Sequence, residues 1–290
     1  MVFLVCCWGL EFIFAKKALE AMEPLTLVFF KYTIGAILVL AFKFRSGDKS
    51  FISKKDIPIF FICAFLGEIG YFYCEYTAMD YLPISLITIV LSFVPVFSIF
   101  IEKILYKRSA TKPMMVGVFF CVCGVTLVIG ADYQELMTGR LVGYVLAFGA
   151  VAFWNAYNFI TASLHNRYTS LSLTFNQLVC SILLLLPYAL FNPPKEGSVD
   201  AGVIGAIIFL GIVSGAMGFI ILVRALHVIG VTPTAMFSNF LPVTGTFFGW
   251  LCFGETISFL QFVGGIIIIG AACLVIHEKE KIVKQTETNI

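Results

Sequence analysis

Four charged side chains interrupt the apolar runs of this sequence. They are Glu11, Lys31, Glu68 and Glu75. A charge inside a lipid bilayer costs about 3 kcal/mol on insertion scales, so a residue of this kind normally has a partner or a function. A carboxyl group could bind a cationic substrate or carry a proton, and a lysine could pair with a carboxylate.

The depths of these four residues suggest which of them could meet. With a rise of about 1.5 Å per helical residue, Glu11 and Glu68 are predicted near the bilayer midplane and Lys31 and Glu75 in its outer third. We therefore predict a Lys31–Glu75 ion pair, which could be structural, could act as an outer gate or could contact a zwitterionic substrate. Glu11 and Glu68 have no obvious partner, and two carboxylates facing one cavity would favour binding of a proton or a cation. The alternative is a protonated glutamate bonded to a neighbouring helix.

The same helix that carries Glu68 and Glu75 also carries aromatic residues. Glu68, Tyr71, Phe72, Glu75 and Met79 recur at helical spacing and share one face. A face that mixes acids and aromatic rings suits an organic cation or an amino acid, because each cation–π contact contributes about 0.5–2 kcal/mol. The alternative is that the tyrosines pack against neighbouring helices.

The second half of the chain offers further candidate side chains for substrate contact. They are Trp154, Tyr157, Asn158 and Asn239. An amide inside an apolar helix requires hydrogen-bond partners, and these could come from a substrate or from another helix.

Two prolines lie inside apolar helices. Pro95 and Pro242 each remove one backbone hydrogen bond and permit a kink. We predict matched bends that shape a cavity or act as hinges, with static kinks as the alternative.

Composition places the whole chain in a membrane. Apolar residues make up 60% of the sequence, 12% are charged and the mean hydropathy is +0.99, whereas soluble domains are about half apolar and a quarter charged. A net charge of +2 gives no reason to expect nucleic acid. The sequence contains no phosphate-binding glycine loop, no histidine cluster and no paired nucleophile and base, so we expect neither an enzyme nor a bound metal or cofactor. The nine cysteines are interpreted as small buried thiols.

Apolar runs of about 20 residues predict an all-α membrane protein with ten transmembrane helices. Their expected ranges are 2–18, 25–43, 57–79, 83–102, 113–131, 140–162, 169–191, 202–225, 231–252 and 258–276. The charged tail from His277 is predicted to be disordered.

The chain contains an internal sequence repeat of two similar halves. A shift of 147 positions superposes Phe93 on Phe240 and Pro95 on Pro242, and a shift of 146 superposes Trp8 on Trp154. The predicted repeats span residues 1–131 and 139–277, followed by a tail over 278–290. Because five helices are an odd number, the second repeat must be inverted relative to the first, which is typical of transporters with a midplane site.

Basic residues predict the orientation of the helices. With a cytoplasmic amino terminus, 14 of the 19 Lys and Arg residues fall on the cytoplasmic side and four on the other. Both termini are therefore expected in the cytoplasm. The first apolar run begins so close to the first residue that the sequence is interpreted as lacking a few residues at its start.

These motifs together resemble the EamA family of the drug/metabolite transporter superfamily. The resemblance covers residues 2–276 and rests on motifs that stand in a characteristic order: Trp8-Gly9, Lys31-Tyr32, Pro95, Pro242, Gly254-Glu255 and Gly264-Gly265. The chain departs from the family in having Lys31 where arginine is usual. The resemblance implies small-molecule transport around a central cavity, commonly export of amino acids or related metabolites.

The sequence thus predicts a secondary transporter in the cell membrane that works by alternating access. Its cavity is expected between helices one, three, four, six, eight and nine of the series. The expected partners are a small polar substrate, protons as a coupling ion and the lipid bilayer, with the protein a monomer or a homodimer. Import or facilitated movement of an organic cation is one alternative. A non-transporting sensor or structural protein is another.

Overall fold

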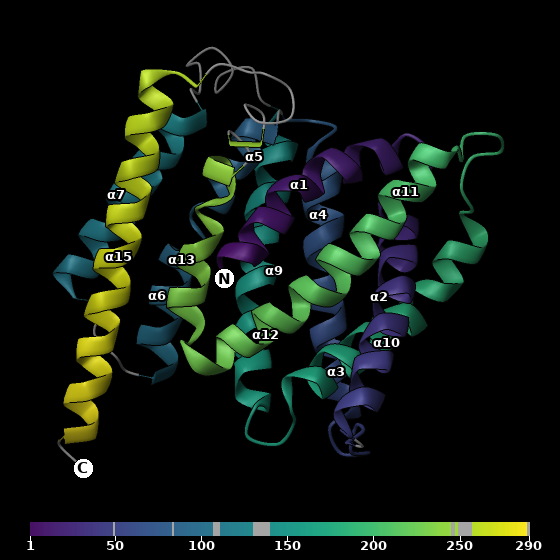
Figure 1. Cartoon of the computed structure of the whole chain (residues 1–290), viewed down its shortest axis with the longest axis horizontal. Coiled ribbons are helices and arrows are strands. Elements are labelled where there is room, and N and C mark those ends of the chain that lie inside the picture. Colours follow the sequence, from purple (N-terminus) through teal and green to yellow (C-terminus); the bar gives the residue numbers. More distant parts are fainter. Residues whose placement is uncertain are drawn as a thin grey trace.

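The structure, a computed structural model, describes residues 1–48, 50–82, 84–106, 111–129, 140–244, 247–248 and 257–288. Within these ranges all regular elements are helical (Figure 1). Seven of the helices in the described part of the chain are long and apolar enough to cross a membrane. The expected all-α membrane fold is confirmed.

The helices follow the predicted ranges closely, with a few internal changes of geometry. The first half contains α1 (Val2–Leu19), α2 (Pro24–Ser46), α3 (Ile57–Cys63), η1 (Ala64–Gly70), α4 (Tyr71–Ala78), α5 (Ile84–Leu91), α6 (Val94–Tyr106) and α7 (Lys112–Ile129). The second half contains α9 (Leu141–Leu164), α10 (Ser170–Phe191), α11 (Ala201–Phe209), η2 (Leu210–Gly218), α12 (Phe219–Val228), α13 (Val231–Ser238) and α15 (Phe259–Thr288).

Local sequence explains several helix ends. Pro24 begins α2, where its missing N–H costs no helical bond. Gly47 ends α2 with φ of 70°, a left-handed conformation that glycine adopts without strain. The side chains of Thr169 and Asp200 accept backbone N–H bonds at the starts of α10 and α11.

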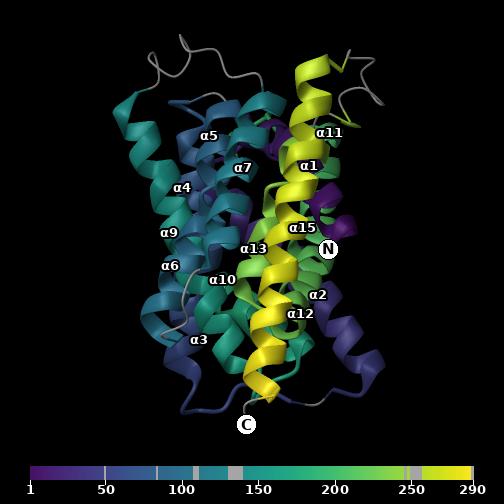
Figure 2. The same ribbon diagram turned by 90° about the vertical axis from the view of Figure 1, so that its left-hand side faces the viewer.

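The helices run between two ends of the molecule, and α7 and α15 lie side by side along one edge (Figures 1 and 2). The chain ends at the lower end in these views, whereas α1 begins near mid-height and rises to the upper end. Two apolar clusters hold the bundle together. The larger joins α1, α2, α4, α9, α10 and α12, and the smaller lies mainly between α7 and α15.

Both halves contain the same two backbone irregularities. The π-helical segments η1 and η2 interrupt the third and eighth predicted helices, and a shift of 147 residues carries one onto the other. The fourth predicted helix is interrupted at residues 92–93 and the ninth at 239–240, which are again 147 positions apart. Irregularities that recur at matched positions belong to the repeated unit, and π-helical turns often occur at functional sites.

Close helix packing fixes how α2 lies against η2. A Cβ atom built on Gly35 would stand 3.3 Å from the backbone of both Gly211 and Gly215. A side chain at these positions would therefore force the helices apart, as expected for small residues at a membrane helix crossing.

Two sequence expectations are corrected by the fold. The tail was predicted to be disordered, but α15 continues as a helix to Thr288, and Lys279 on it forms a buried ion pair with Glu102. The histidines were expected to lie apart, but the rings of His165 and His227 stack with centroids 4.6 Å apart. The Gly254-Glu255 motif and the segment between the two predicted repeats, 132–138, lie outside the described residues.

Candidate functional site

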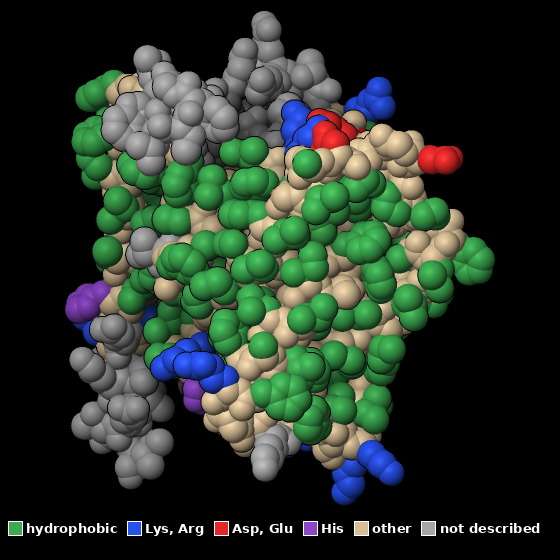
Figure 3. Space-filling model, turned by 45° about the vertical axis from the view of Figure 1, so that its right-hand side comes forward, with side chains coloured by type: hydrophobic (Ala, Val, Ile, Leu, Met, Phe, Trp, Pro, Cys, Tyr) green, Lys and Arg blue, Asp and Glu red, His purple; other side chains and the backbone are tan. Residues whose placement is uncertain are grey.

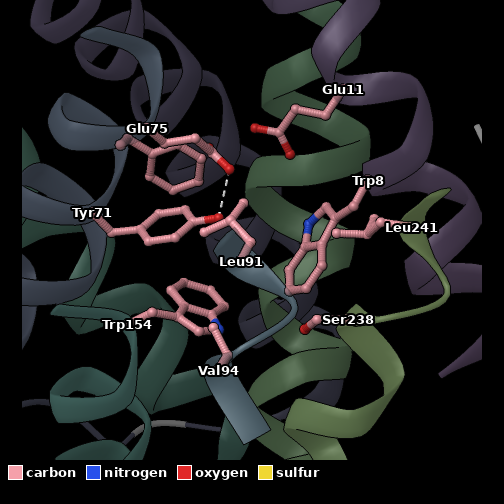
Figure 4. Close-up of a pocket in the computed structure, with 10 residues that line it drawn as sticks. Trp8, Glu11, Tyr71, Glu75, Leu91, Val94, Trp154, Ser238 and Leu241 are labelled. Carbon is pink, nitrogen blue, oxygen red and sulfur yellow. Dashed lines mark hydrogen bonds between the residues drawn. The ribbon is translucent and has the colours of Figure 1, made fainter. Parts of the chain in front are cut away.

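A small pocket lies between the two halves of the chain. It is lined by Trp8, Glu11, Tyr71, Phe72, Glu75, Leu91, Val94, Trp154, Ser238 and Leu241 (Figure 4). These residues come from α1, α4, α5, α6, α9, α13 and the segment that follows α13. The cavity volume is about 40 Å³, which leaves room for a few water molecules. This conformation is therefore closed around the pocket, and a larger ligand requires it to widen.

Matched positions of the two repeats meet at the pocket. The rings of Trp8 and Trp154 contact edge to face with centroids 5.8 Å apart. The repeat also relates Leu91 to Ser238 and Val94 to Leu241, and all four line the pocket. The pocket thus lies where two inverted repeats would share an axis, which is the usual place for the substrate site of such carriers.

The two prolines affect the backbone of two residues that line the pocket. Pro95 and Pro242 have no N–H to donate to the carbonyl groups four residues earlier, which belong to Leu91 and Ser238. Leu91 is the last residue of α5 and Ser238 the last of α13. The interruptions next to the predicted kinks therefore place two helix ends at the pocket.

Glu11 forms a buried ion pair at the upper part of the pocket. The Lys31 Nζ donates a hydrogen bond of 2.5 Å to Glu11 Oε1, and the Tyr76 hydroxyl donates another of 2.9 Å to the same oxygen. The side chains of Lys31 and Glu11 are 0% and 9% exposed. The Lys31 Nζ also lies 3.7 Å from the centroid of the Phe72 ring. These contacts replace water around the ammonium group and cancel the charge of Glu11.

Glu75 lies on the opposite side of the pocket from Glu11 (Figure 4). Its Oε1 accepts a hydrogen bond of 2.6 Å from the Tyr71 hydroxyl, and the residue is 4% exposed. Within the described residues Glu75 has no ion-pair partner. The predicted Lys31–Glu75 pair was therefore wrong: Lys31 pairs with Glu11 instead.

The geometry of the α1–α2 hairpin explains this change of partner. Glu11 is eight residues before the end of α1 at Leu19, and Lys31 is seven residues after the start of α2 at Pro24. At about 1.5 Å per residue they lie about 12 and 10 Å below the same turn. The depth estimate from sequence placed Glu11 near the midplane, but the start of α1, and not its middle, lies at mid-height (Figure 1). Equal distance from the turn is the signal that could have identified the pair.

Glu68 and Tyr157, two of the predicted site residues, lie outside the pocket lining. Glu68 is fully buried and accepts a hydrogen bond from Ser181, while its second carboxyl oxygen has no partner within the described residues. Tyr157 donates to Gln177, at 3.1 Å. The expectation that Glu11 and Glu68 share one cavity is corrected, because Glu75 is the second carboxyl of the pocket.

The two predicted asparagines are also buried away from the pocket lining. Asn158 is 1% exposed, and its side-chain oxygen and nitrogen lack hydrogen-bond partners in the described part of the chain. Asn239 donates to the Ser92 carbonyl oxygen and to Cys121 Sγ, each at 3.2 Å. Asn239 therefore links the two helix interruptions to each other. Trp8 and Ser238 were not among the predicted site residues, although the repeat pairs Trp8 with the predicted Trp154.

A polar cluster joins the two halves at the lower end of the molecule. Asp48 accepts hydrogen bonds from the hydroxyls of Ser50, Thr169 and Ser172 and lies 3.5 Å from Lys43 Nζ. Burial acts to raise the pKa of the Asp48 carboxyl, but these hydrogen bonds outweigh it and hold that pKa below its ordinary value. The cluster connects the chain after α2 to the start of α10.

A second ion pair reinforces this connection. Arg167 donates a hydrogen bond of 2.5 Å to Asp56, whose other oxygen accepts one of 2.6 Å from the Tyr168 hydroxyl. Burial and the neighbouring Asp56 raise the pKa of the Tyr168 phenol. Within the described residues, no group of three or more His, Cys, Asp or Glu side chains is arranged to hold a metal ion.

Comparison with known proteins identifies what this arrangement is similar to. The family model described as the EamA-like transporter family matches residues 1–130 and 141–277. The chain is 22% identical over 266 residues to the uncharacterized transporter YyaM of Bacillus subtilis (strain 168), which covers 90% of this chain and 87% of that protein. It is 24% identical over 212 residues to the uncharacterized inner membrane transporter YhbE of Escherichia coli (strain K12), covering 71% and 65% of the two chains. A solved crystal structure superposes with a TM-score of 0.78 at 15% identity, covering 94% of this chain and 95% of the other.

Proposed function

Because the chain belongs to the EamA-like transporter family, and is therefore a multi-pass membrane transporter and not an enzyme, we propose that its substrate is a small metabolite with a cationic amine group. We propose that it moves by alternating access through the pocket between the two halves. Export is the direction that the family resemblance favours, with both termini in the cytoplasm.

The chemistry of the pocket supports a cationic substrate. Aromatic rings of Trp8, Tyr71, Phe72 and Trp154 surround two carboxyl groups, and such rings attract an ammonium group through their π faces. Among the described residues, no Lys or Arg lines the pocket. Lys31, which lies next to it, is already bound by Glu11. A cation thus finds more complementary groups than a substrate carboxylate does, so amines fit better than zwitterionic amino acids.

Glu75 is the single feature on which the proposal rests. Its carboxyl faces the pocket without a cationic partner among the described residues, so it can bind either a substrate amine or a proton. If the two compete for this carboxyl, entry of a proton from one side releases the amine there. A proton gradient would then drive amine movement in the opposite direction. Glu68 remains a candidate for a structural role, since its hydrogen bond goes to Ser181.

The test is flux into proteoliposomes for a panel of amines, quaternary ammonium compounds and amino acids, with and without a pH gradient. We expect saturable, gradient-driven flux of amines that Glu75→Gln reduces at least tenfold. Glu196→Gln, which changes an exposed carboxyl, is the matched control and should retain native flux. Flux of the same amines that is unchanged in Glu75→Gln would contradict the role of this carboxyl. Transport of neutral or anionic metabolites alone would contradict the substrate class.

A further inference from the structure

A second, larger cavity opens far from the central pocket. It is a groove of about 700 Å³ at the lower end of the molecule, between the end of α2, the start of α10 and α12. Figure 3 shows one face of the molecule as a broad hydrophobic band with Lys and Arg side chains near its lower end. Neither the transport proposal nor the family comparison assigns a ligand to this groove.

The groove arises from the way α2 crosses η2. The helices touch at Gly35 and Gly215, and each continues downward beyond this contact. Arg45 is ten residues beyond Gly35, and Arg224 is nine residues beyond Gly215. At about 1.5 Å per residue, both arginines lie about 14–15 Å along their helices from the crossing, and both line the groove. Two positive charges from different helices thus face one groove.

The charge of the groove is strongly one-sided. Arg45 and Arg224 are both exposed, and neither forms an ion pair with any described residue. Ser46, Thr169 and Ser170 add hydroxyl groups, and no Asp or Glu among the described residues lines the groove. These groups complement a phosphate, since arginine guanidinium groups bind phosphate oxygens through paired hydrogen bonds.

Apart from His227, the remaining side chains of the lining are apolar. Phe42 on α2, Met217 on η2 and Ile221 on α12 lie on the membrane side of the arginines. Phe42 is 38% exposed, and Val228, the last residue of α12, is 68% exposed. A soluble phosphate would leave this apolar wall without a partner, whereas an acyl chain would cover it.

We propose that the groove binds an anionic phospholipid, with its phosphate between Arg45 and Arg224 and an acyl chain along Phe42 and Ile221. Basic pockets between membrane helices commonly hold such headgroups on the side where basic residues concentrate. Arg45 belongs to the first half and Arg224 to the second, so the lipid bridges the two halves. The lipid contacts neither Glu75 nor any other residue of the central pocket.

The test is binding of phosphatidylglycerol to the purified full chain, with phosphatidylcholine as the neutral lipid, followed by native mass spectrometry. We expect the native chain to prefer phosphatidylglycerol at least tenfold. The double variant Arg45→Gln/Arg224→Gln should weaken phosphatidylglycerol binding about 30-fold, which corresponds to about 2 kcal/mol. The control Lys103→Gln/Lys112→Gln removes the same charge from α6 and α7, outside the groove, and should retain the preference.

Three results of the binding measurement would overturn the proposal, and a fourth comes from the competition described below. They are equal binding of the two lipids, an unchanged preference in the arginine variant, or loss of the preference in the lysine control. A competition arm distinguishes the source of the phosphate: inorganic phosphate at millimolar concentration should leave the bound lipid in place, and displacement would assign the groove to a soluble phosphate. Each arginine is also replaced alone by lysine, which keeps the charge. These variants should retain the preference and show that the protein folds.

Discussion

The Lys31–Glu11 pair makes the sharpest prediction about stability. Lys31 Nζ and Glu11 Oε1 are 2.5 Å apart, and both side chains are almost fully buried. At an effective dielectric constant of about 20, the Coulomb attraction between the two charges is about 7 kcal/mol. Most of this offsets the loss of hydration, and the net contribution of the intact pair is small. Removal of one partner leaves the other charge buried without compensation. We therefore expect Glu11→Gln or Lys31→Met to lower the free energy of unfolding by about 3–5 kcal/mol.

A double-mutant cycle isolates the pair. The variant Glu11→Gln/Lys31→Met leaves neither charge behind, so its loss should be smaller than the sum of the single losses by at least about 2 kcal/mol. The assay is denaturant unfolding in detergent micelles, followed by the circular dichroism of the helices.

A second double-mutant cycle, which combines Glu75→Gln with Lys31→Met, serves as the control. Glu75 accepts one hydrogen bond from Tyr71, so Glu75→Gln should cost about 1–3 kcal/mol and couple weakly to Lys31→Met. Additive losses for Glu11 and Lys31, or a stronger coupling of Lys31 to Glu75 than to Glu11, would refute the assignment of the pair.

Two further predictions concern packing and pH. Gly67→Ala should destabilise the fold by about 1–3 kcal/mol in the same unfolding assay, because its Cβ would stand 2.2 Å from the Tyr157 ring; Gly205→Ala, which meets no atom within 4 Å, is the control, and an equal loss in both would contradict the steric reasoning. Asp48 has a pKa below its ordinary value in the folded protein, so its stabilising contribution is present above the unfolded pKa of about 3.9 and is lost as pH falls through the folded one. The difference in thermal unfolding midpoint between the native chain and Asp48→Asn should therefore be constant from pH 7 to about 5 and shrink at lower pH, and a difference that grows on acidification would contradict the sign.

Helix positions could be predicted from this sequence because the signals are local. Length and hydropathy set where helices such as α2 and α10 begin and end, and the repeat indicates that Trp8 and Trp154 are equivalent. A single sequence predicts less about the rotation and tilt of the helices. These depend on contacts between segments that are distant in sequence, such as the contact of Gly35 with Gly215.

Contacts between distant segments determine which residues line the candidate site. The tilt and start of α1 moved Glu11 from the expected midplane to the level of Lys31. Packing of α10 against η1 gave Glu68 the partner Ser181 and removed it from the pocket. The π-helical geometry of η1 also changes the direction of the side chains around it, which the expected regular helical spacing did not include.

The ion pair next to the pocket has an electrical consequence for the proposed carrier. Lys31 cancels the charge of Glu11, so the Glu75 carboxyl is the pocket group whose charge can follow the bound ligand. One proton or one monovalent amine neutralises it equally, so a one-for-one exchange moves no net charge across the bilayer. A membrane potential of 100 mV changes the free energy of moving one net charge across the bilayer by about 2.3 kcal/mol. This cycle moves no net charge, so the potential would not change its free energy. The exchange would be electroneutral, driven by the two chemical gradients and indifferent to membrane potential.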